Sequence, residues 1–133
     1  MINGTVIDSS VWVNYFSQSN WEQVKTANKI MDSKKLFMLP VILQEVLQGI
    51  ADDKLFDKIR YNFLAFKGIN FDQYYASLEA AKMYRFLRKK GVTIRKPNDC
   101  LIAWLCTEFN LSLYHNDKDF NNIAKHTSLK IYK

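Results

Sequence analysis

Short apolar runs alternate with longer helical patterns along the chain, and this alternation restricts the folds that it can adopt. The runs lie at residues 5–7, 35–39, 111–115 and 129–132 and are rich in β-branched and aliphatic side chains. The segments between them repeat apolar residues every three or four positions, as amphipathic helices do. Strands separated by helices form βα units, so the pattern predicts an α/β fold, a three-layer α/β/α sandwich with a central, mostly parallel sheet.

Residue types that start or end helices set the expected boundaries of these segments. Ser19 stands three residues before Glu22, which is a capping-box pattern, and Gly68 and Gly91 stand where two later helices can end. Residues 91–96 are expected to form an extended connection. Helices are expected to begin near Ser9, Ser19, Pro40, Asp52, Asp72, Pro97 and Phe120.

The length and composition favour one folded domain over residues 1–133. Hydrophobic residues make up 48% and charged residues 24% of the chain, and neither a linker nor a repeat interrupts it. No apolar run approaches the roughly 18 residues that a membrane span requires, and the start MINGTVIDSS lacks the blocks of a secretory signal. We therefore expect a cytoplasmic protein without a membrane partner. Cys100 and Cys106 fit core positions of one helix better than a zinc site or a disulfide.

The net charge of +6 favours a polyanionic partner, because cationic surfaces gain affinity for phosphates by releasing counterions. Many of the basic residues lie between residues 85 and 96. For the cluster at 85–90, the alternative is that these Lys and Arg side chains only keep a helix soluble and complement the dipole of its last turn.

Acidic side chains follow two of the expected strands. Asp8 lies at the end of the first strand, and Asp117 and Asp119 lie just past the strand at 111–115. Ligands of a parallel sheet gather beyond the carboxyl ends of its strands, so these acids are expected to share a cleft. Each also has a structural explanation, because Asp8 can cap a helix and the other two can order a turn.

Two further acids lie on helices that are otherwise apolar. Glu45 has Gly49 four residues later, which leaves room beside its carboxylate, and Asp99 shares a helix face with Ile102. Asp99 can simply favour a helix N-terminus, and Glu45 can pair with a buried Arg or Lys. Four segments that each deliver a carboxylate nevertheless favour a bound cation, because clustered acids repel one another. Oxygen ligands without a Cys/His set indicate a hard ion, Mg²⁺ or Mn²⁺.

Four stretches of the sequence carry these acids or surround them. They are VIDSSVWVNYF, LPVILQEVLQGI, IRKPNDCLIAWL and LYHNDKDFNNIA. In order and spacing they resemble the motifs of the PIN domain and, within it, of the VapC toxins of bacterial toxin–antitoxin pairs. The resemblance covers essentially the whole chain and implies the α/β/α fold. It also implies a Mg²⁺- or Mn²⁺-dependent endoribonuclease that leaves a 5′-phosphate and a 3′-hydroxyl.

The resemblance further implies roles for single residues. His115 departs from the family pattern, in which Thr or Ser is commoner, and it can orient the nucleophile, contact the phosphate or support a carboxylate. The matching catalytic and metal-binding positions are Asp8, Glu45, Asp99 and Asp117, and the auxiliary ones are Ser10, His115 and Asp119.

The partners implied by the resemblance are an RNA substrate, a cognate antitoxin protein and a second copy of the chain in a homodimer. Two other readings stay open: a PIN module that binds RNA or protein without cutting, and an RNA-processing nuclease that is not a toxin. A phosphotransfer enzyme with Asp8 as nucleophile fits less well, because such enzymes usually carry a second Asp where this chain has Ser10. Contacts to RNA phosphates are expected from Arg85, Arg88, Arg95 and Lys96.

Overall fold

The computed structural model describes residues 3–133, and within them it contains four strands and seven helices. Strands and helices follow one another as the sequence pattern predicts. The elements are β1 (Gly4–Ile7), α1 (Ser9–Ser17), α2 (Trp21–Asp32), β2 (Leu36–Phe37), α3 (Pro40–Gln48), α4 (Asp53–Leu64), α5 (Gln73–Lys89), α6 (Asn98–Glu108), β3 (Leu111–Tyr114), α7 (Lys118–His126) and β4 (Lys130–Ile131).

The strands form one sheet in the order β2-β1-β3-β4, and every strand pairing within residues 3–133 is parallel. β1 and β3 form its centre, paired from Gly4 with Leu111 to Ile7 with Tyr114. β1 is buried along its whole length, as expected for a strand that is covered on both faces. The parallel sheet predicted from the sequence is confirmed.

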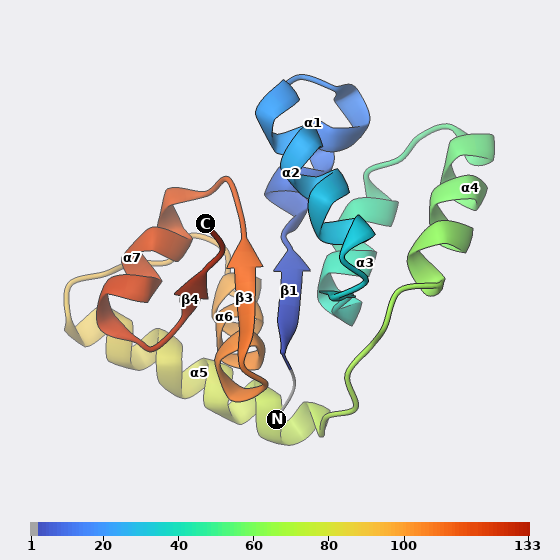
Figure 1. The fold of residues 1–133 in the computed structure, drawn as a ribbon. Coiled ribbons are helices and arrows are strands. Elements are labelled where there is room, and N and C mark those ends of the chain that lie inside the picture. Colours follow the sequence, from blue (N-terminus) through green and yellow to red (C-terminus); the bar gives the residue numbers. More distant parts are fainter. Residues whose placement is uncertain (1–2) are drawn as a thin grey trace.

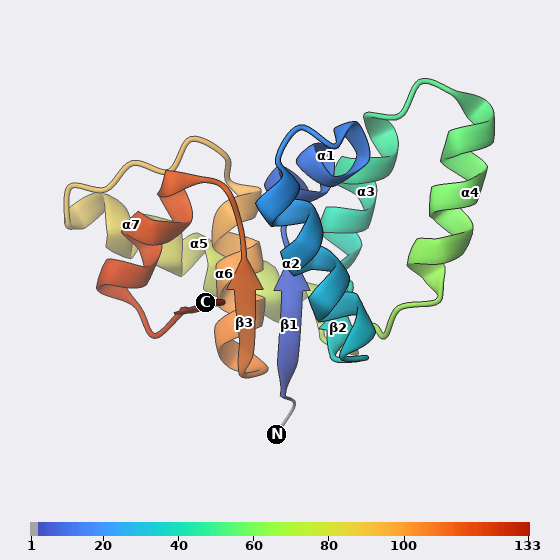
Figure 2. The same ribbon diagram turned by 45° about the horizontal axis from the view of Figure 1, so that its top comes forward.

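Helices cover both faces of this sheet (Figure 1). α5 and α6 lie behind β1 and β3, and Figure 2 shows α2 in front of β1 and β2. The largest fully buried side chains come from several helices and include Trp12, Ile102 and Phe120. The predicted three-layer α/β/α arrangement is therefore confirmed.

The start of α2 differs from the prediction. Asn20 caps this helix, because its side-chain oxygen accepts a hydrogen bond from the Gln23 N–H at 3.2 Å. Ser19 instead donates its hydroxyl proton to Asn14 Oδ1 at 3.1 Å. The capping box expected from Ser19 is wrong because the neighbouring Asn, which caps helices equally well, takes that position.

The end of α4 also differs, since the helix stops at Leu64 and not at Gly68. The reason lies in the sheet: the Met38 N–H donates to the Lys67 carbonyl at 2.8 Å, and Phe37 forms a parallel bridge with Lys67. After Leu64 the chain turns at Ala65 and Phe66, and Lys67 then pairs with Phe37 of β2.

α6 supplies the buried centre of the molecule. Its residues Cys100 and Cys106 are buried free thiols, which confirms them as core residues, and burial raises the pKa of Cys100 to about 11. Asp99 is buried on the same helix, with 2% of its surface exposed. A buried carboxylate is costly unless a hydrogen-bond donor or a cation lies beside it. The groups that can do this for Asp99 lie at the carboxyl edge of the sheet.

Candidate metal centre at the carboxyl edge of the sheet

The two central strands bring Asp8 and the chain after Tyr114 together. Asp8 directly follows β1, and its backbone N–H donates to the Tyr114 carbonyl at 2.9 Å. The pairing of β1 with β3 therefore continues for one more hydrogen bond beyond the strands. Residues from the two ends of the sequence meet at this edge, as the parallel topology predicts.

Asp8 performs two tasks with its two carboxylate oxygens. Oδ2 accepts a hydrogen bond from the Ser10 N–H at 3.0 Å and so caps α1. Oδ1 is buried and has no hydrogen-bond partner among residues 3–133. The helix-cap explanation of Asp8 is thus correct for one oxygen and leaves the other without compensation.

Asp99 lies in the first turn of α6 and is in a similar position. Its Oδ2 is buried without a hydrogen-bond partner in the described part of the chain. The pKa of this carboxyl is raised to about 7, mainly by burial and next by the negative charge of Asp8; Asp117 and Glu45 also raise it, and Lys96 lowers it. The pKa of Asp99 therefore depends on the charges of the other acids in the cluster as well as on its own burial.

Asp117 and Asp119 complete the cluster from the start of α7. Asp117 caps this helix, because its Oδ1 accepts a hydrogen bond from the Asp119 N–H at 3.0 Å. One carboxylate oxygen each of Asp99, Asp117 and Asp119 lies within 4.8 Å of the others, which is close enough for one ion to contact all three. The structure thus places Asp119, expected in an auxiliary position, in one group of three acids with Asp99 and Asp117.

Arg95 and Lys96 approach these acids from the connection before α6. Arg95 Nε lies 3.2 Å from Asp119 Oδ2, and its terminal nitrogen lies 3.3 Å from Asp117 Oδ1. Lys96 Nζ lies 3.3 Å from Asp117 Oδ2. Burial alone would raise the pKa of Asp117, but the Asp119 N–H and these two cations outweigh it, so the pKa lies below its usual value. Both cations were expected to contact RNA, and here they compensate carboxylates.

The other two basic residues of the predicted RNA contacts lie on the exposed side of α5. Arg85 lines a hollow together with Pro97 and Asn98, which precede Asp99. Arg88 lies one turn further along the helix, beside Lys89. Contact of either residue with RNA stays a prediction.

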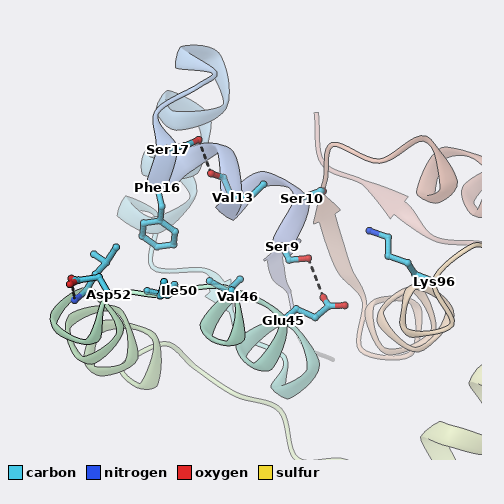
Figure 3. A pocket seen from close by; sticks show the side chains of 13 residues that line it. Ser9, Ser10, Val13, Phe16, Ser17, Glu45, Val46, Ile50, Asp52 and Lys96 are labelled. Atoms are coloured by element: carbon cyan, nitrogen blue, oxygen red, sulfur yellow. Dashed lines mark hydrogen bonds between the residues drawn. The ribbon is translucent and has the colours of Figure 1, made fainter.

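Glu45 reaches the acidic cluster from α3 and is half-buried. Its Oε1 accepts a hydrogen bond from the Ser9 hydroxyl at 3.1 Å, and Figure 3 shows this pair facing Lys96 across the site. The sequence reasoning missed Ser9 as the partner of Glu45. The only available signal was its position directly after Asp8, at the first residue of α1.

Ser10 and His115 organise the backbone around the acids. Ser10 Oγ accepts a hydrogen bond from the Asn116 N–H at 2.9 Å, which joins α1 to the turn after β3. His115 Nδ1 accepts one from the Asp117 N–H at 3.0 Å, and burial lowers the pKa of the imidazole. An acceptor nitrogen and a lowered pKa both describe a neutral ring. This favours the third role considered for His115, the support of a neighbouring carboxylate.

A parallel α/β sheet with buried carboxylates gathered at its carboxyl edge offers a set of oxygen ligands compatible with a divalent cation. Residues 5–126 match the family model described as PIN domain, and the chain belongs to this family.

Several known proteins are similar to this chain in sequence or in fold. The chain is 31% identical to Ribonuclease VapC11 of Mycobacterium tuberculosis over 127 residues, which cover 94% of this chain and 95% of that protein. It is equally similar to VapC ribonuclease Mb1587 of Mycobacterium bovis. The fold matches the crystal structure of VapBC2 from Rickettsia felis bound to a promoter DNA fragment, with a TM-score of 0.75 at 18% identity and coverage of 99% and 98% of the two chains. DNA-bound VapBC from Salmonella typhimurium matches with a TM-score of 0.75 at 16% identity, over 97% and 96% of the chains.

None of the helices within residues 3–133 combines the length and the apolar character that crossing a membrane would require.

Proposed function

We propose that this PIN domain is an endoribonuclease that hydrolyses RNA phosphodiester bonds with the help of a divalent metal ion, and that it is the toxin of a toxin–antitoxin pair. One observation carries the proposal: Asp8 and Asp99 are each buried with one uncompensated oxygen, beside Asp117. A structure that gathers such groups needs a cation to offset their desolvation and mutual repulsion. Ribonuclease activity is named for the 31%-identical relatives over almost the full chain.

The residues present fit a hard divalent ion. All the donors are carboxylate oxygens, two of which have no other partner in the described chain. We assign the ion to Asp8, Asp99 and Asp117, with Glu45 as a further ligand or as the group that orients water, and with Asp119 as an auxiliary acid close enough to contact an ion held by Asp99 and Asp117. Mg²⁺ or Mn²⁺ suits such a site. When bound, the ion lowers the pKa of a water molecule and offsets negative charge on the phosphate.

The side chains around the acids have separate tasks in this proposal. Ser9 donates to Glu45 and fixes the direction of its carboxylate, so that Glu45 can accept a proton from the attacking water. Lys96 lies near enough to Asp117 to offset charge at the edge of the site where the RNA phosphate enters. His115 and Ser10 hold the turn that carries Asp117.

A toxin of this kind has an antitoxin protein as its binding partner. The VapBC structures that share this fold are complexes, and on that basis we propose that a cognate antitoxin protein neutralises this chain. We further propose that the chain forms a homodimer. The same proposal includes one PIN domain spanning residues 1–133 and a location in the cytoplasm. An RNA-processing nuclease would share the site but would not need a neighbouring antitoxin gene, and its expression alone would not arrest growth.

Asp8→Asn and Asp99→Asn test the proposed site. Each change removes one negative charge while keeping the shape of the side chain, and Asn retains the helix cap at position 8. We expect cleavage of total RNA to fall by about a hundredfold or more, because a bound ion supplies several kcal/mol of stabilisation to the transition state. Growth arrest on expression without the antitoxin should be lost as well.

Asp72→Asn is the matched control for these changes, because Asp72 is an exposed acid that caps α5 and lies outside the acidic cluster. It should cleave RNA as the unaltered protein does. Full activity in purified Asp8→Asn and Asp99→Asn would refute the site. Calorimetry that detects no binding of Mn²⁺ or Mg²⁺ to the unaltered protein would favour a PIN module without catalytic activity.

A further inference from the structure

A groove leads away from the acidic cluster between α1 and α3 and ends at the start of α4. Its volume is about 580 Å³, within the roughly 300–1,000 Å³ of sites for small ligands. The end next to the acids is polar and is formed by Ser9, Ser10, Glu45 and Lys96. The groove is therefore continuous with the site at which the phosphate is expected.

Apolar side chains form the rest of the groove. α1 contributes Val13 and Phe16, of which 63% and 37% are exposed, and α4 contributes Leu55, of which 41% is exposed. Figure 3 shows the Phe16 ring projecting from α1 toward Val46 and Ile50. These side chains would lose unfavourable contact with water if a flat apolar group lay between them.

Phe16 is held firmly enough to act as a stacking surface. Its ring stacks on Trp12 with a centroid distance of 5.8 Å and an interplanar angle of 18°, and Trp12 is fully buried. The Phe16 ring also contacts Phe63 at 6.0 Å between centroids. A supported aromatic ring loses little freedom when a second ring packs against it.

Gly49 keeps the groove open at the turn of α3 that follows Glu45. A Cβ atom at this position would contact only the carbonyl oxygens of Val46 and Glu45, at 3.6 and 3.8 Å, and nothing from another element within 4 Å. Its φ of −86° is compatible with any residue. A methyl group therefore fits here, whereas a long side chain would extend into the groove that Gly49 lines.

We propose that this groove receives the unpaired base of the nucleotide next to the scissile phosphate. The inference rests on the proposed function, because an RNA phosphate held at the acids and Lys96 places the neighbouring nucleoside at the mouth of the groove. The apolar middle of the groove offers no cation to a phosphate but fits the flat face of a base. Stacking on an aromatic ring is the usual way in which proteins hold single-stranded bases, and it makes Gly49 and Phe16 determinants of substrate choice.

The test combines a change in the protein with a change in the RNA. A short single-stranded RNA is made around a cleavage site mapped by sequencing RNA ends, with either the natural base or an abasic sugar on each side of the scissile bond. For the unaltered protein, removal of the base on one side should lower kcat/KM by about tenfold, the size of one lost stacking contact. Gly49→Leu should show the same loss with the natural RNA. With the abasic RNA it should show little further loss, because the change in the protein and the change in the RNA remove the same stacking interaction.

Gly68→Leu is the matched control, because Gly68 lies outside the groove and a Cβ atom there meets nothing within 4 Å; it should stay within about twofold of the unaltered protein for each RNA. If Gly49→Leu does not fold, Phe16→Ala takes its place in the same comparison. Equal kinetics of Gly49→Leu and the unaltered protein on the natural RNA would overturn the proposal. Unchanged RNA kinetics together with loss of antitoxin binding would assign the groove to the antitoxin and overturn it as well. Absence of RNA cleavage by the unaltered protein would refute the proposed function itself.

Discussion

At the scale of single residues, Asp99 is the acid of the cluster whose ionisation the folded protein clearly disfavours. It is buried, one of its oxygens is uncompensated, and its pKa lies at about 7 because burial and the charge of Asp8 disfavour ionisation. The unfolded chain releases this proton near the ordinary value of about 4. Between these two values the folded protein binds more protons than the unfolded chain, so the contribution of Asp99 to stability falls as the pH rises.

Asp99→Asn should therefore stabilise the metal-free protein in a pH-dependent manner. With a chelator present, the gain in the free energy of unfolding over the unaltered protein should grow from pH 5 to pH 7 and reach about 2–4 kcal/mol at pH 8. Urea denaturation at several pH values measures this difference. A difference for Asp99→Asn that does not change with pH would contradict the burial argument.

The convergence of the acids could be predicted from the sequence more readily than the contacts between them. Asp8 and Asp117 follow paired strands, so the topology alone brings them together. The ion pairs of Arg95 with Asp117 and Asp119 join residues 22 and 24 positions apart through side-chain conformations that no periodicity encodes. Ser9 was missed for the same reason, since its bond to Glu45 depends on the angle between α1 and α3.

At the scale of elements, β1 and β2 approach each other closely at Gly4. A Cβ atom on Gly4 would lie 2.5 Å from the Lys35 carbonyl oxygen and 2.5 Å from the Phe37 ring. The backbone atom cannot move aside without disturbing the pairing of the two strands. The central strand therefore requires glycine at its first position.

Gly4→Ala should consequently destabilise the protein by about 1–3 kcal/mol, the usual cost of overpacking a rigid site. Thermal unfolding followed by circular dichroism gives the measurement. Gly68→Ala is the matched control, because a Cβ atom there meets nothing within 4 Å, and its melting temperature should not fall. Equal stability of the two variants would show that β2 can shift away from β1 at no cost.

The elements themselves were largely predictable because strands and helices differ in their apolar period. The errors lie at boundaries, where neighbouring residues compete for one role. Asn20 displaced Ser19 as the cap of α2, and the bridge between Phe37 and Lys67 ended α4 before Gly68. Tertiary contacts of this kind decide boundaries that local sequence leaves open.

At the scale of the whole molecule, the basic residues behind the net charge of +6 lie at different distances from the acidic cluster. Lys96 lies at the acidic cluster and lines the groove, whereas Arg88 lies on the exposed side of α5 among other basic residues. A cation near the scissile phosphate stabilises one defined contact, and a distant one adds only to the general field.

Lys96→Ala should raise KM for RNA by about tenfold and lower the salt dependence of binding by about one released counterion. Arg88→Ala removes the same charge from the molecule and should raise KM less than Lys96→Ala does, because a phosphate contact on α5 lies away from the acidic cluster. Cleavage kinetics and RNA binding at several salt concentrations distinguish the two variants. Equal effects of both changes would mean that only the total charge matters.

The pairing of β1 with β3 has a consequence for the synthesis of the protein. The partner of the first strand is Leu111–Tyr114, and the last two acids of the site follow at Asp117 and Asp119. A nascent chain that still holds these residues inside the ribosome has neither the centre of its sheet nor a complete acidic cluster. The acidic cluster is therefore complete only after the chain through Asp119 has left the ribosome, and shorter nascent chains should not cut RNA.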